Sequence, residues 1–517
     1  MTGTVSLANA VRVWDTVCRH IDGVAIGSTM AALGERGALG LLCLSDVTSF
    51  GALRKELGAN AGFLNVAVRL LVTQGWVRCD GEPGTDELTI TPTPAGRAVM
   101  TSYADAFGAA VAALSAGDTH PVWSLPAGAD ARARAHVLTQ LDGHVVTPVM
   151  AGLARHGLAG LDGAAVKVLQ GQGWALPCGE LTDDGRLALS MAAQYRYPMV
   201  YLPLLRAVPE LLFGDPSSVL SDAETHLDRE QDIGFSGDVF AALCREPFLE
   251  IALPLFDASP LRDQPAIVAD MGCGDGVMLE TLYTAVRDRT ARGRALAGHP
   301  LLMVGADPSP VARRVCAERL AAAGIPHLVM DGDIADPPAF ARALGAAGLD
   351  AANALHICKS AIHDRAYRRA PLGAVPSASA VPSACAVPSG AVPSPECSGA
   401  YALPDGGAVP ASALAANLAG LFASWRDLTR RHGWLVIEAH AIPAAKAPGL
   451  IGRTLVTALD ATQGYSCQYL VEPEVFAWAA RSSGLRSRAH RAPAEAVIGH
   501  AALTIDHFVH VGRCHSD

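Results

Sequence analysis

Hydrophobic and polar positions along this chain of 517 residues follow two different patterns. In the C-terminal half, short apolar runs stand between stretches of helical spacing, which is typical of buried parallel strands that alternate with helices. Such alternation indicates an α/β fold with a doubly wound sheet. We predict a helix at 411–431 and strands at 266–269, 301–306, 327–330, 350–357, 434–438 and 504–511.

The N-terminal part is mostly helical in pattern. Apolar residues at helical spacing cover 25–40, 49–58 and 61–71, and a hairpin follows between Gly75 and Thr91. This order predicts a winged-helix-like module whose recognition helix is 61–71. A similar arrangement recurs later in the chain, and both copies contain a Gly-Trp step, which predicts a degenerate tandem repeat over 20–100 and 145–190.

The candidate recognition helix does not have the composition of a DNA-reading surface. Helices that read DNA present several Arg, Lys, Asn or Gln side chains, whereas Arg69 is the only cation in 61–71 and its neighbours are mainly apolar or small. We therefore expect the module to serve in dimerisation, giving a homodimer, or as a lid over a substrate.

These patterns divide the chain into three predicted regions. A winged-helix-like module covers 1–110, a helical and second winged-helix-like lid region covers 111–261, and an α/β catalytic domain covers 262–517. Repeats of Ala-Val-Pro-Ser interrupt the last region at 371–399. Because prolines at this spacing exclude helix and sheet, we predict a disordered surface insertion there.

Composition narrows the class of protein. The net charge is −10, hydrophobic residues make up 50% and charged residues 17%, so we expect no nucleic-acid partner, which would favour a basic surface. We expect neither a signal peptide nor a membrane span, because Met1 to Ala10 lacks a basic region and no run reaches about 18 apolar residues. The twelve cysteines are scattered without a CxxC pair, which favours a cytoplasmic location.

A glycine-rich turn carries the first candidate chemistry. The segment 270–276 reads Asp-Met-Gly-Cys-Gly-Asp-Gly between a predicted strand and a predicted helix. Glycine allows positive φ angles and the close approach of a ligand. The spacing is not the GxGxxG of a pyrophosphate site, and an acid two residues before the first glycine suits a cationic ligand. The motif resembles motif I of class I S-adenosylmethionine (SAM) methyltransferases, which implies that SAM binds at Asp270, Gly272, Gly274 and Gly276.

Two further acids follow the next two predicted strands. Asp307 ends the second strand, where an acid can accept both ribose hydroxyl groups of a nucleotide. Asp333 follows the third strand, and in the resembled family an acid at this position bonds the adenine amino group. The three strand ends therefore predict one cofactor site formed by Asp270, Asp307 and Asp333.

Two histidines follow the fourth and fifth strands, at the edge where open parallel sheets bind ligands. His363 and His440 are therefore candidate catalytic residues, and two interpretations stay open. Either histidine could act as a general base. Alternatively, His363, His440 and the amide of Gln468 could hold a metal ion that stabilises the enolate of a 1,3-dicarbonyl substrate.

Beyond these motifs, most of the chain resembles methyltransferases associated with polyketide synthases, particularly the apratoxin-type loading-module C-methyltransferases. The resemblance implies methylation of the α-carbon of a malonyl-type acyl thioester on a carrier protein, in some relatives beside Fe²⁺ or Mn²⁺. It implies His440 and Gln468 as metal ligands, with His363 nearby. The matching segments are 224–229, 270–276, 363–365, 399–401, 425, 432–433, 438–440 and 464–468.

The chain departs from these relatives because it lacks recognisable ketosynthase or carrier segments and carries the repeat insertion after His363. We therefore expect a SAM-dependent methyltransferase that methylates carbon next to a carbonyl in a polyketide-type specialised metabolite, either as a small molecule or as a carrier-bound acyl group. One alternative is a small-molecule O-methyltransferase with a histidine base and no metal. Another is a SAM-sensing regulator that uses the winged helix.

Overall fold

The computed structural model describes residues 6–126, 130–221, 226–368, 395–493, 495 and 500–511. The chain forms two compact units, and each is assembled from separate segments. The first unit contains Met1–Asp228, Ser398–Pro410 and Ile442–Gln468, and the second contains Arg229–Cys397, Ala411–Ala441 and Tyr469–Asp517. This division does not coincide with the predicted boundaries after residues 110 and 261. Of the predicted insertion, residues 371–394 lie outside the described part.

The second unit is built on a seven-stranded sheet with the order β11-β12-β10-β7-β4-β5-β6. The five strands from β10 to β6 are parallel, β12 is antiparallel to β10, and β11 is antiparallel to β12. This arrangement confirms the predicted doubly wound α/β fold, and an antiparallel hairpin of β11 and β12 ends the sheet. The strands are β4 (Ile267–Met271), β5 (Leu302–Ala306), β6 (His327–Met330), β7 (Ala354–Lys359), β10 (Trp434–Ala439), β11 (Leu485–Arg491) and β12 (Leu503–His510).

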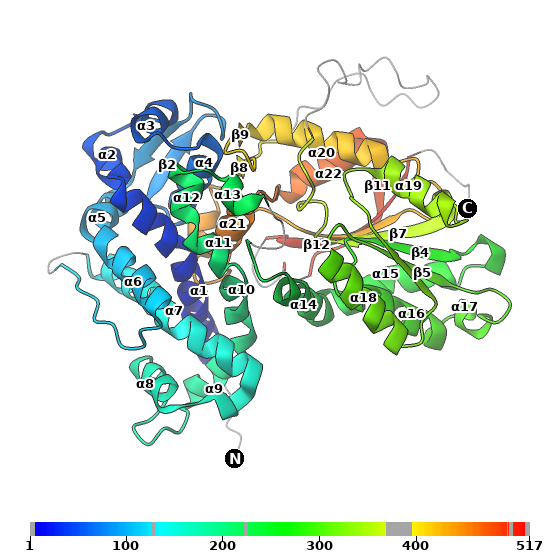
Figure 1. Cartoon of the computed structure of the whole chain (residues 1–517), viewed down its shortest axis with the longest axis horizontal. Helices are drawn as coiled ribbons and strands as arrows, with labels where there is room; N and C mark the ends of the chain where they lie inside the picture. Colours follow the sequence, from blue (N-terminus) through cyan, green and yellow to red (C-terminus); the bar gives the residue numbers. More distant parts are fainter. Residues whose placement is uncertain are drawn as a thin grey trace. The chain divides into compact units, whose positions relative to one another are not determined.

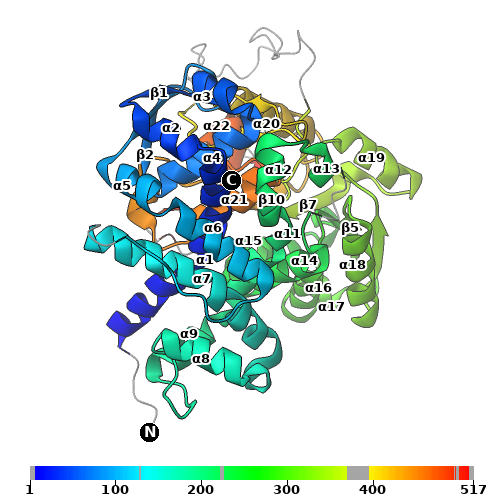
Figure 2. The same ribbon diagram turned by 60° about the vertical axis from the view of Figure 1, so that its left-hand side comes forward.

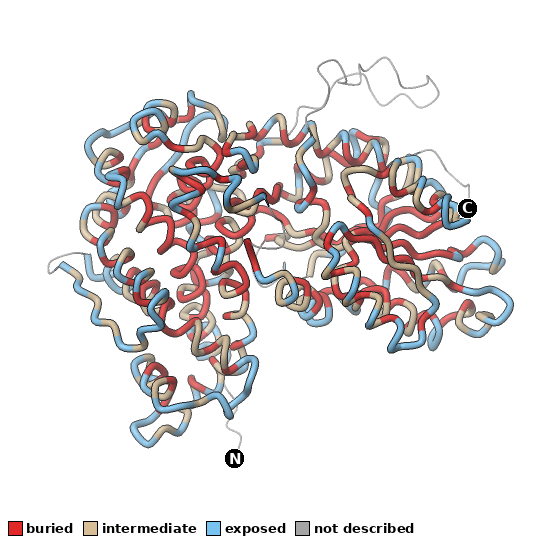
Figure 3. The backbone as a smooth tube through the Cα atoms, viewed as in Figure 1, coloured by how far each residue is buried: buried red, intermediate tan, exposed pale blue. Residues whose placement is uncertain are grey.

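Helices cover both faces of this sheet. In Figure 1, α16 and α18 lie on one side and α19, α20 and α22 on the other. Four of the parallel strands, β4, β5, β7 and β10, are almost wholly buried (Figure 3), because helices from the crossover connections pack on each face. The edge strand β6 is half-buried. The helices are α14 (Arg229–Val239), α15 (Arg245–Ala252), α16 (Val277–Arg289), α17 (Ala291–Arg294), α18 (Pro310–Ala322), α19 (Pro337–Ala346), α20 (Ala411–Trp425) and α22 (Pro473–Ser482).

The first unit is mainly helical, and two long helices, α1 (Leu7–Glu35) and α7 (Ala131–His156), pack closely in it (Figure 2). A Cβ atom on Gly23 would lie 2.2 Å from the Gln140 carbonyl oxygen, and one on Gly143 would lie 2.2 Å from that of His20. Only glycine therefore permits this approach. Other helices are α5 (Pro94–Ser102), α6 (Ala104–Ala116), α8 (Gly163–Gly171), α9 (Asp183–Ser190), α10 (Arg196–Val200), α11 (Leu202–Arg206), α12 (Val208–Phe213) and α13 (Ser217–Leu220).

The predicted winged-helix segment contains α2 (Ala38–Leu44), α3 (Phe50–Leu57) and α4 (Ala61–Thr73). Its strands β1 (Thr48–Ser49), β2 (Val77–Asp80) and β3 (Thr89–Pro92) form a sheet of order β1-β3-β2. Every residue of α4 from Gly62 to Leu71 is buried, because α21 (Val456–Tyr465), β8 (Tyr401–Ala402) and β9 (Ala408–Val409) pack against it. A helix enclosed in this way has no free face for the major groove of DNA.

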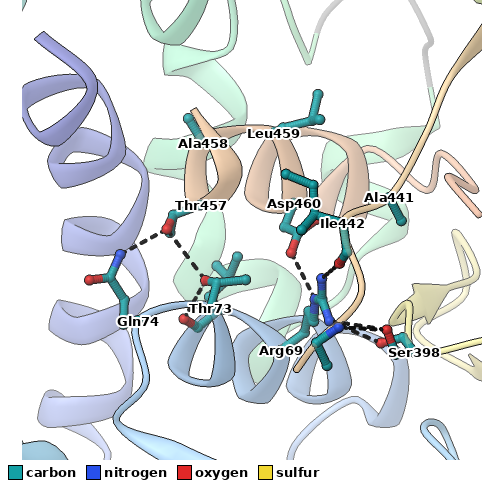
Figure 4. A network of polar contacts seen from close by, with 12 residues as sticks. Arg69, Thr73, Gln74, Ser398, Ala441, Ile442, Thr457, Ala458, Leu459 and Asp460 are labelled. Atoms are coloured by element: carbon teal, nitrogen blue, oxygen red, sulfur yellow. Dashed lines mark hydrogen bonds and ion pairs between the residues drawn. The ribbon is translucent and has the colours of Figure 1, made fainter. Parts of the chain in front are cut away.

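Arg69 is part of this enclosure and not of an exposed surface. Its guanidinium pairs with Asp460 at 2.7 Å and donates to the carbonyl oxygens of Ile442 and Ser398, as Figure 4 shows. The Arg69 and Asp460 side chains are only 6% and 9% exposed. One buried cation of α4 therefore holds both C-terminal segments that complete the first unit.

The two glycine-tryptophan steps on which the predicted tandem repeat rests make the same hydrogen bonds in the first unit, and the repeat as a whole stays a prediction. In the first copy, the Thr93 hydroxyl donates to the Gly75 carbonyl at 2.8 Å and its backbone N–H donates to Trp76 at 2.9 Å. In the second copy, Thr182 makes the same two bonds, to the Gly173 and Trp174 carbonyl oxygens, at 2.9 and 3.0 Å. Two glycine-tryptophan turns therefore fold with the same contacts.

No single described helix is both long and apolar enough to cross a membrane. The bent pair α5 and α6 passes that test together, by length and composition alone.

We predict that Arg69→Ala lowers the free energy of unfolding by about 3–5 kcal/mol, because it removes the cation from a buried carboxylate. Urea denaturation followed by tryptophan fluorescence measures this. Arg54→Ala on the adjacent helix is the matched control. Its ion pair with Asp86 is partly exposed, so the expected loss is within about 1 kcal/mol. Equal losses in the two variants would contradict the structural role of Arg69.

Candidate functional site

The glycine turn between β4 and α16 has the geometry that its sequence predicts. Gly272, Gly274 and Gly276 have φ angles of 81°, 51° and 78°, and the helix begins directly after Gly276. A Cβ atom on Gly272 would lie 2.8 Å from the Ala361 side chain. Both the left-handed backbone and the lack of space therefore require glycine here, and the turn brings backbone to the strand end where a ligand binds.

Asp270 is a buried acid near the end of β4, the middle one of the five parallel strands. It is 1% exposed, and neither carboxylate oxygen has a hydrogen-bond partner among the residues that the structure describes. Burial raises its pKa well above the usual range. Buried polar atoms without partners are rare in native proteins, so these oxygens fit a ligand that brings a cation or N–H donors, as the ammonium group of SAM does.

Asp307 connects the second strand end to the glycine turn. Its carboxylate accepts the N–H of Gly274 at 3.1 Å and that of Ser309 at 2.9 Å. Burial raises its pKa, although these two backbone bonds oppose the shift. Each carboxylate oxygen has two lone pairs, so accepting one bond leaves capacity for a ribose hydroxyl. The structure thus brings Asp307 and Gly274 together, and ribose binding stays a prediction.

Asp333 lies beyond the third strand and is half-buried. It accepts the N–H of Ala335 at 2.8 Å and pairs with Arg368 at 2.7 Å. Arg368 and Ala335 already bind lone pairs of the Asp333 carboxylate. The predicted contact of Asp333 with adenine therefore requires the remaining lone pairs.

Helix α14 packs against the glycine turn within the same unit. A Cβ atom on Gly237 would come 2.7 Å from the Asp275 carboxylate, and one on Gly274 would lie 3.9 Å from Ile233. Directly after α14 the chain makes a turn of π-helix at Phe240–Cys244, a form often found at functional sites. This helix therefore covers the turn that the sequence assigns to the cofactor.

Sequence reasoning missed Arg319, which braces the turn from α18. Its guanidinium donates to the Asp275 carbonyl at 2.7 Å and carboxylate at 2.8 Å, and it also pairs with Glu280 at 3.0 Å. Nothing local in the sequence marks this arginine, because its partners lie about forty residues away.

His363 forms a buried pair with Glu438. Its Nδ1 lies within hydrogen-bond distance of one Glu438 oxygen, and since a carboxylate only accepts, Nδ1 carries the proton. Glu438 also accepts the N–H groups of Ile362 at 3.1 Å and Ala439 at 2.9 Å. Sequence reasoning missed this partner, although its place at the end of the fifth strand was a signal.

The pair changes the basicity of both groups. Burial lowers the pKa of His363, but the charge and hydrogen bond of Glu438 outweigh it and leave the pKa raised. Burial alone would raise the pKa of Glu438, whereas His363 holds it below its usual value. The imidazole is thereby fixed with Nε2 as the nitrogen that can accept a proton, in the arrangement of a general base and its orienting acid.

The predicted metal ligands do not fit a metal ion as they are arranged. His440 is fully buried, with Nδ1 3.3 Å from the Val471 carbonyl oxygen and Nε2 2.8 Å from the Thr504 hydroxyl. Burial lowers its pKa to about 4. Both ring nitrogens are therefore occupied, which also argues against His440 as the base. Gln468 belongs to the first unit, whereas both histidines belong to the second.

No group of three or more His, Cys, Asp or Glu side chains within the described ranges could hold a metal ion. The structure therefore gives the predicted Fe²⁺ or Mn²⁺ no support, and His363 is the one predicted catalytic residue with a suitable partner.

We predict that Gly272→Ala weakens the binding of S-adenosylhomocysteine by about tenfold or more, because the new methyl group strains φ and meets Ala361. Isothermal titration calorimetry measures the affinity. Gly420→Ala, at an exposed position of helix α20 with open space around it, is the control and should bind normally. Unchanged affinity in Gly272→Ala would remove the turn from the cofactor site.

Comparison with known proteins places this geometry in a family. The model of the AprA MT2-like domain matches residues 224–497, and that of the AprA N-terminal domain matches residues 13–79. No curated protein matches the chain.

Three solved structures are similar to this chain at low identity. A CurJ carbon methyltransferase is 9% identical over 95% of this chain and 91% of its own, with a TM-score of 0.43. A DszA carbon methyltransferase is 12% identical over 98% of this chain and 94% of its own, with a TM-score of 0.42. An O-methyltransferase family 2 protein from Planctomyces limnophilus, in complex with apigenin, is 12% identical over 97% of this chain and 96% of its own, with a TM-score of 0.39. None is similar enough to carry an argument about the reaction. Because the MT2-like model spans more than half of the sequence, the chain belongs to the AprA MT2-like family and is a SAM-dependent methyltransferase.

Proposed function

We propose that this enzyme methylates the carbon next to a carbonyl group in a polyketide-type acyl substrate, with His363 as the general base and Glu438 as its positioning residue. The observation that carries the proposal is the buried His363–Glu438 pair at the carboxyl ends of β7 and β10. Ligands bind at this edge in open parallel sheets, so the base lies at the same edge as the glycine turn.

The chain's own groups supply the proton transfer. Nε2 of His363 takes a proton from the α-carbon, and the C–H electron pair becomes an enolate that attacks the methyl group in line. Glu438 stabilises the imidazolium that forms. When bound, SAM supplies the electrophilic methyl group and leaves as S-adenosylhomocysteine. A buried site that holds both reactants in line can provide effective molarities of about 10⁵ M or more.

The buried pair also fits the deprotonation of a carbon acid. The raised pKa of His363 favours removal of a proton from a weak acid such as the α-carbon of an acyl thioester, and the same base would also serve a hydroxyl acceptor. The resemblance of the sequence motifs to those of polyketide-synthase-associated C-methyltransferases supports carbon as the acceptor. A free small molecule and a carrier-bound acyl group are both compatible with this chemistry, whereas a metal ion is not needed for it.

O-methylation would use the same histidine and is the main alternative. The regulator reading loses its support, because α4 is buried and Arg69 pairs with Asp460.

We predict that kcat of the wild type rises with pH as His363 loses its proton, through a pKa above the usual histidine value. Glu438→Gln removes the anion that favours imidazolium, so the acid limb of the kcat profile should move to lower pH while kcat falls. His363→Ala should lower kcat by about 10²- to 10⁴-fold. Initial rates across pH measure all three.

Glu318→Gln, an exposed acid on α18, is the matched control and should keep the wild-type profile. If the acid limb stays in place in Glu438→Gln, the pair does not set the basicity of the catalytic group.

We predict that the enzyme with bound S-adenosylhomocysteine exchanges the α-hydrogen of a malonyl-type acyl thioester with deuterium from D₂O. Deprotonation needs no methyl transfer, so exchange should exceed the uncatalysed rate and disappear in His363→Ala. Mass spectrometry measures it on the N-acetylcysteamine thioester and on the same acyl group attached to a carrier protein.

Exchange on only one of these two substrates would identify the form of the acceptor. Absence of exchange on both, with methyl transfer to a hydroxyl compound, would replace this proposal by O-methylation. Loss of exchange on chelation, restored by Fe²⁺ or Mn²⁺, would bring back the metal-assisted reaction.

A further inference from the structure

Lys359 is the last residue of β7, the strand that pairs with β4. Its partly buried ammonium donates to the Ser236 hydroxyl on α14 at 2.6 Å and lies 3.5 Å from the Ser360 hydroxyl. An ammonium has three N–H donors, so at least one stays available. Ser360 has a φ of 54°, a strained conformation for a residue other than glycine, of the kind that clusters at functional sites.

Register places Lys359 on the same face as Asp270. In the parallel pair of β4 and β7, Asp270 is opposite Ile357, so their side chains point to one face of the sheet. Lys359 follows Ile357 by two residues and points the same way. A cation and an acid whose oxygens have no described partner therefore stand on neighbouring strand ends.

Among the described residues, Lys359 forms no ion pair. Within the described part of the chain, its hydrogen bonds go to hydroxyl groups, and no carboxylate lies within ion-pair distance. By contrast, Arg319 beside the same turn is held by Asp275 and Glu280. Burial lowers the pKa of Lys359, and negative groups around it oppose that shift.

The choice of lysine is itself informative. Four of the 40 basic residues in this chain are lysines, and Lys359 is the only one in the second unit. Lysine differs from arginine in presenting a compact point charge with rotatable donors, which suits a narrow site that binds one anionic group.

We propose that Lys359 binds the carboxylate of the methionyl part of SAM while Asp270 accepts its ammonium, so that the two residues read the amino-acid end of the cofactor. Lys359 is then a cofactor-positioning residue, and its bond to Ser236 couples α14 to the occupied site. This inference rests on the assignment of SAM to the glycine turn.

The test compares two ligands that differ in the carboxylate alone. Calorimetry measures the affinities of S-adenosylhomocysteine and its decarboxylated analogue for the wild type and for Lys359→Met, which keeps the length of the side chain. The variant should lose about tenfold or more in affinity for S-adenosylhomocysteine, because a charge-assisted hydrogen bond is lost, and less than about threefold for the analogue. Lys446→Met, an exposed lysine in the first unit, is the control.

Equal losses for both ligands, or no loss for either, would overturn the proposal. A fall in kcat with unchanged ligand affinities would also overturn it and place Lys359 on the acyl substrate instead.

A second arm needs no variant and keeps the proposal testable if Lys359→Met fails to fold. The wild type should bind the decarboxylated analogue at least about tenfold more weakly than S-adenosylhomocysteine, because the ammonium of Lys359 then lacks its anion. Equal affinities would overturn the proposal while leaving the cofactor assignment intact. Failure of the wild type to bind either ligand would overturn both.

Discussion

The parallel hydrogen bonding of β4 with β5 and β7 is the constraint on which the site depends. In-register pairing brings the strand ends to one edge of the sheet, and with them Asp270, Asp307 and Lys359. Strand β10 pairs with β7 and brings Glu438 to the same edge of the sheet. Burying charged groups is costly unless they are paired or ligated. Asp307 and Glu438 accept backbone N–H groups, and Glu438 also pairs with His363. For Asp270, whose oxygens have no described partner, the proposed partner is the ammonium group of SAM.

The glycine turn lies at that edge of the sheet and forms the predicted binding surface for the cofactor. Gly272, Gly274 and Gly276 have positive φ angles and no side chains, so backbone borders the space that the sequence assigns to the cofactor. Arg319 and Asp307 then hold the turn by its carbonyl and N–H groups, so the loop is fixed before a ligand arrives. Preorganisation of this kind reduces the ordering cost of binding.

The first unit follows a different principle, in which distant segments complete a helical core. Helix α21 is buried over most of its length and packs on α1 and α4, although it follows the fifth strand of the sheet. Arg69 holds this segment and Ser398 by polar contacts. The chain therefore enters the first unit three times, and no single cut would separate two complete units.

The sequence by itself determined the sheet, the glycine turn and the acids at its strand ends, because apolar runs, glycine spacing and the residue after each strand are local patterns. It also indicated the repeated glycine-tryptophan turn. Only the tertiary structure decided how the side chains pair. It joined His363 to Glu438 across 75 positions, enclosed His440 between Thr504 and Val471, and turned Arg69 inward to Asp460. These outcomes depend on strand register and on packing between remote segments, which no local pattern of residues records.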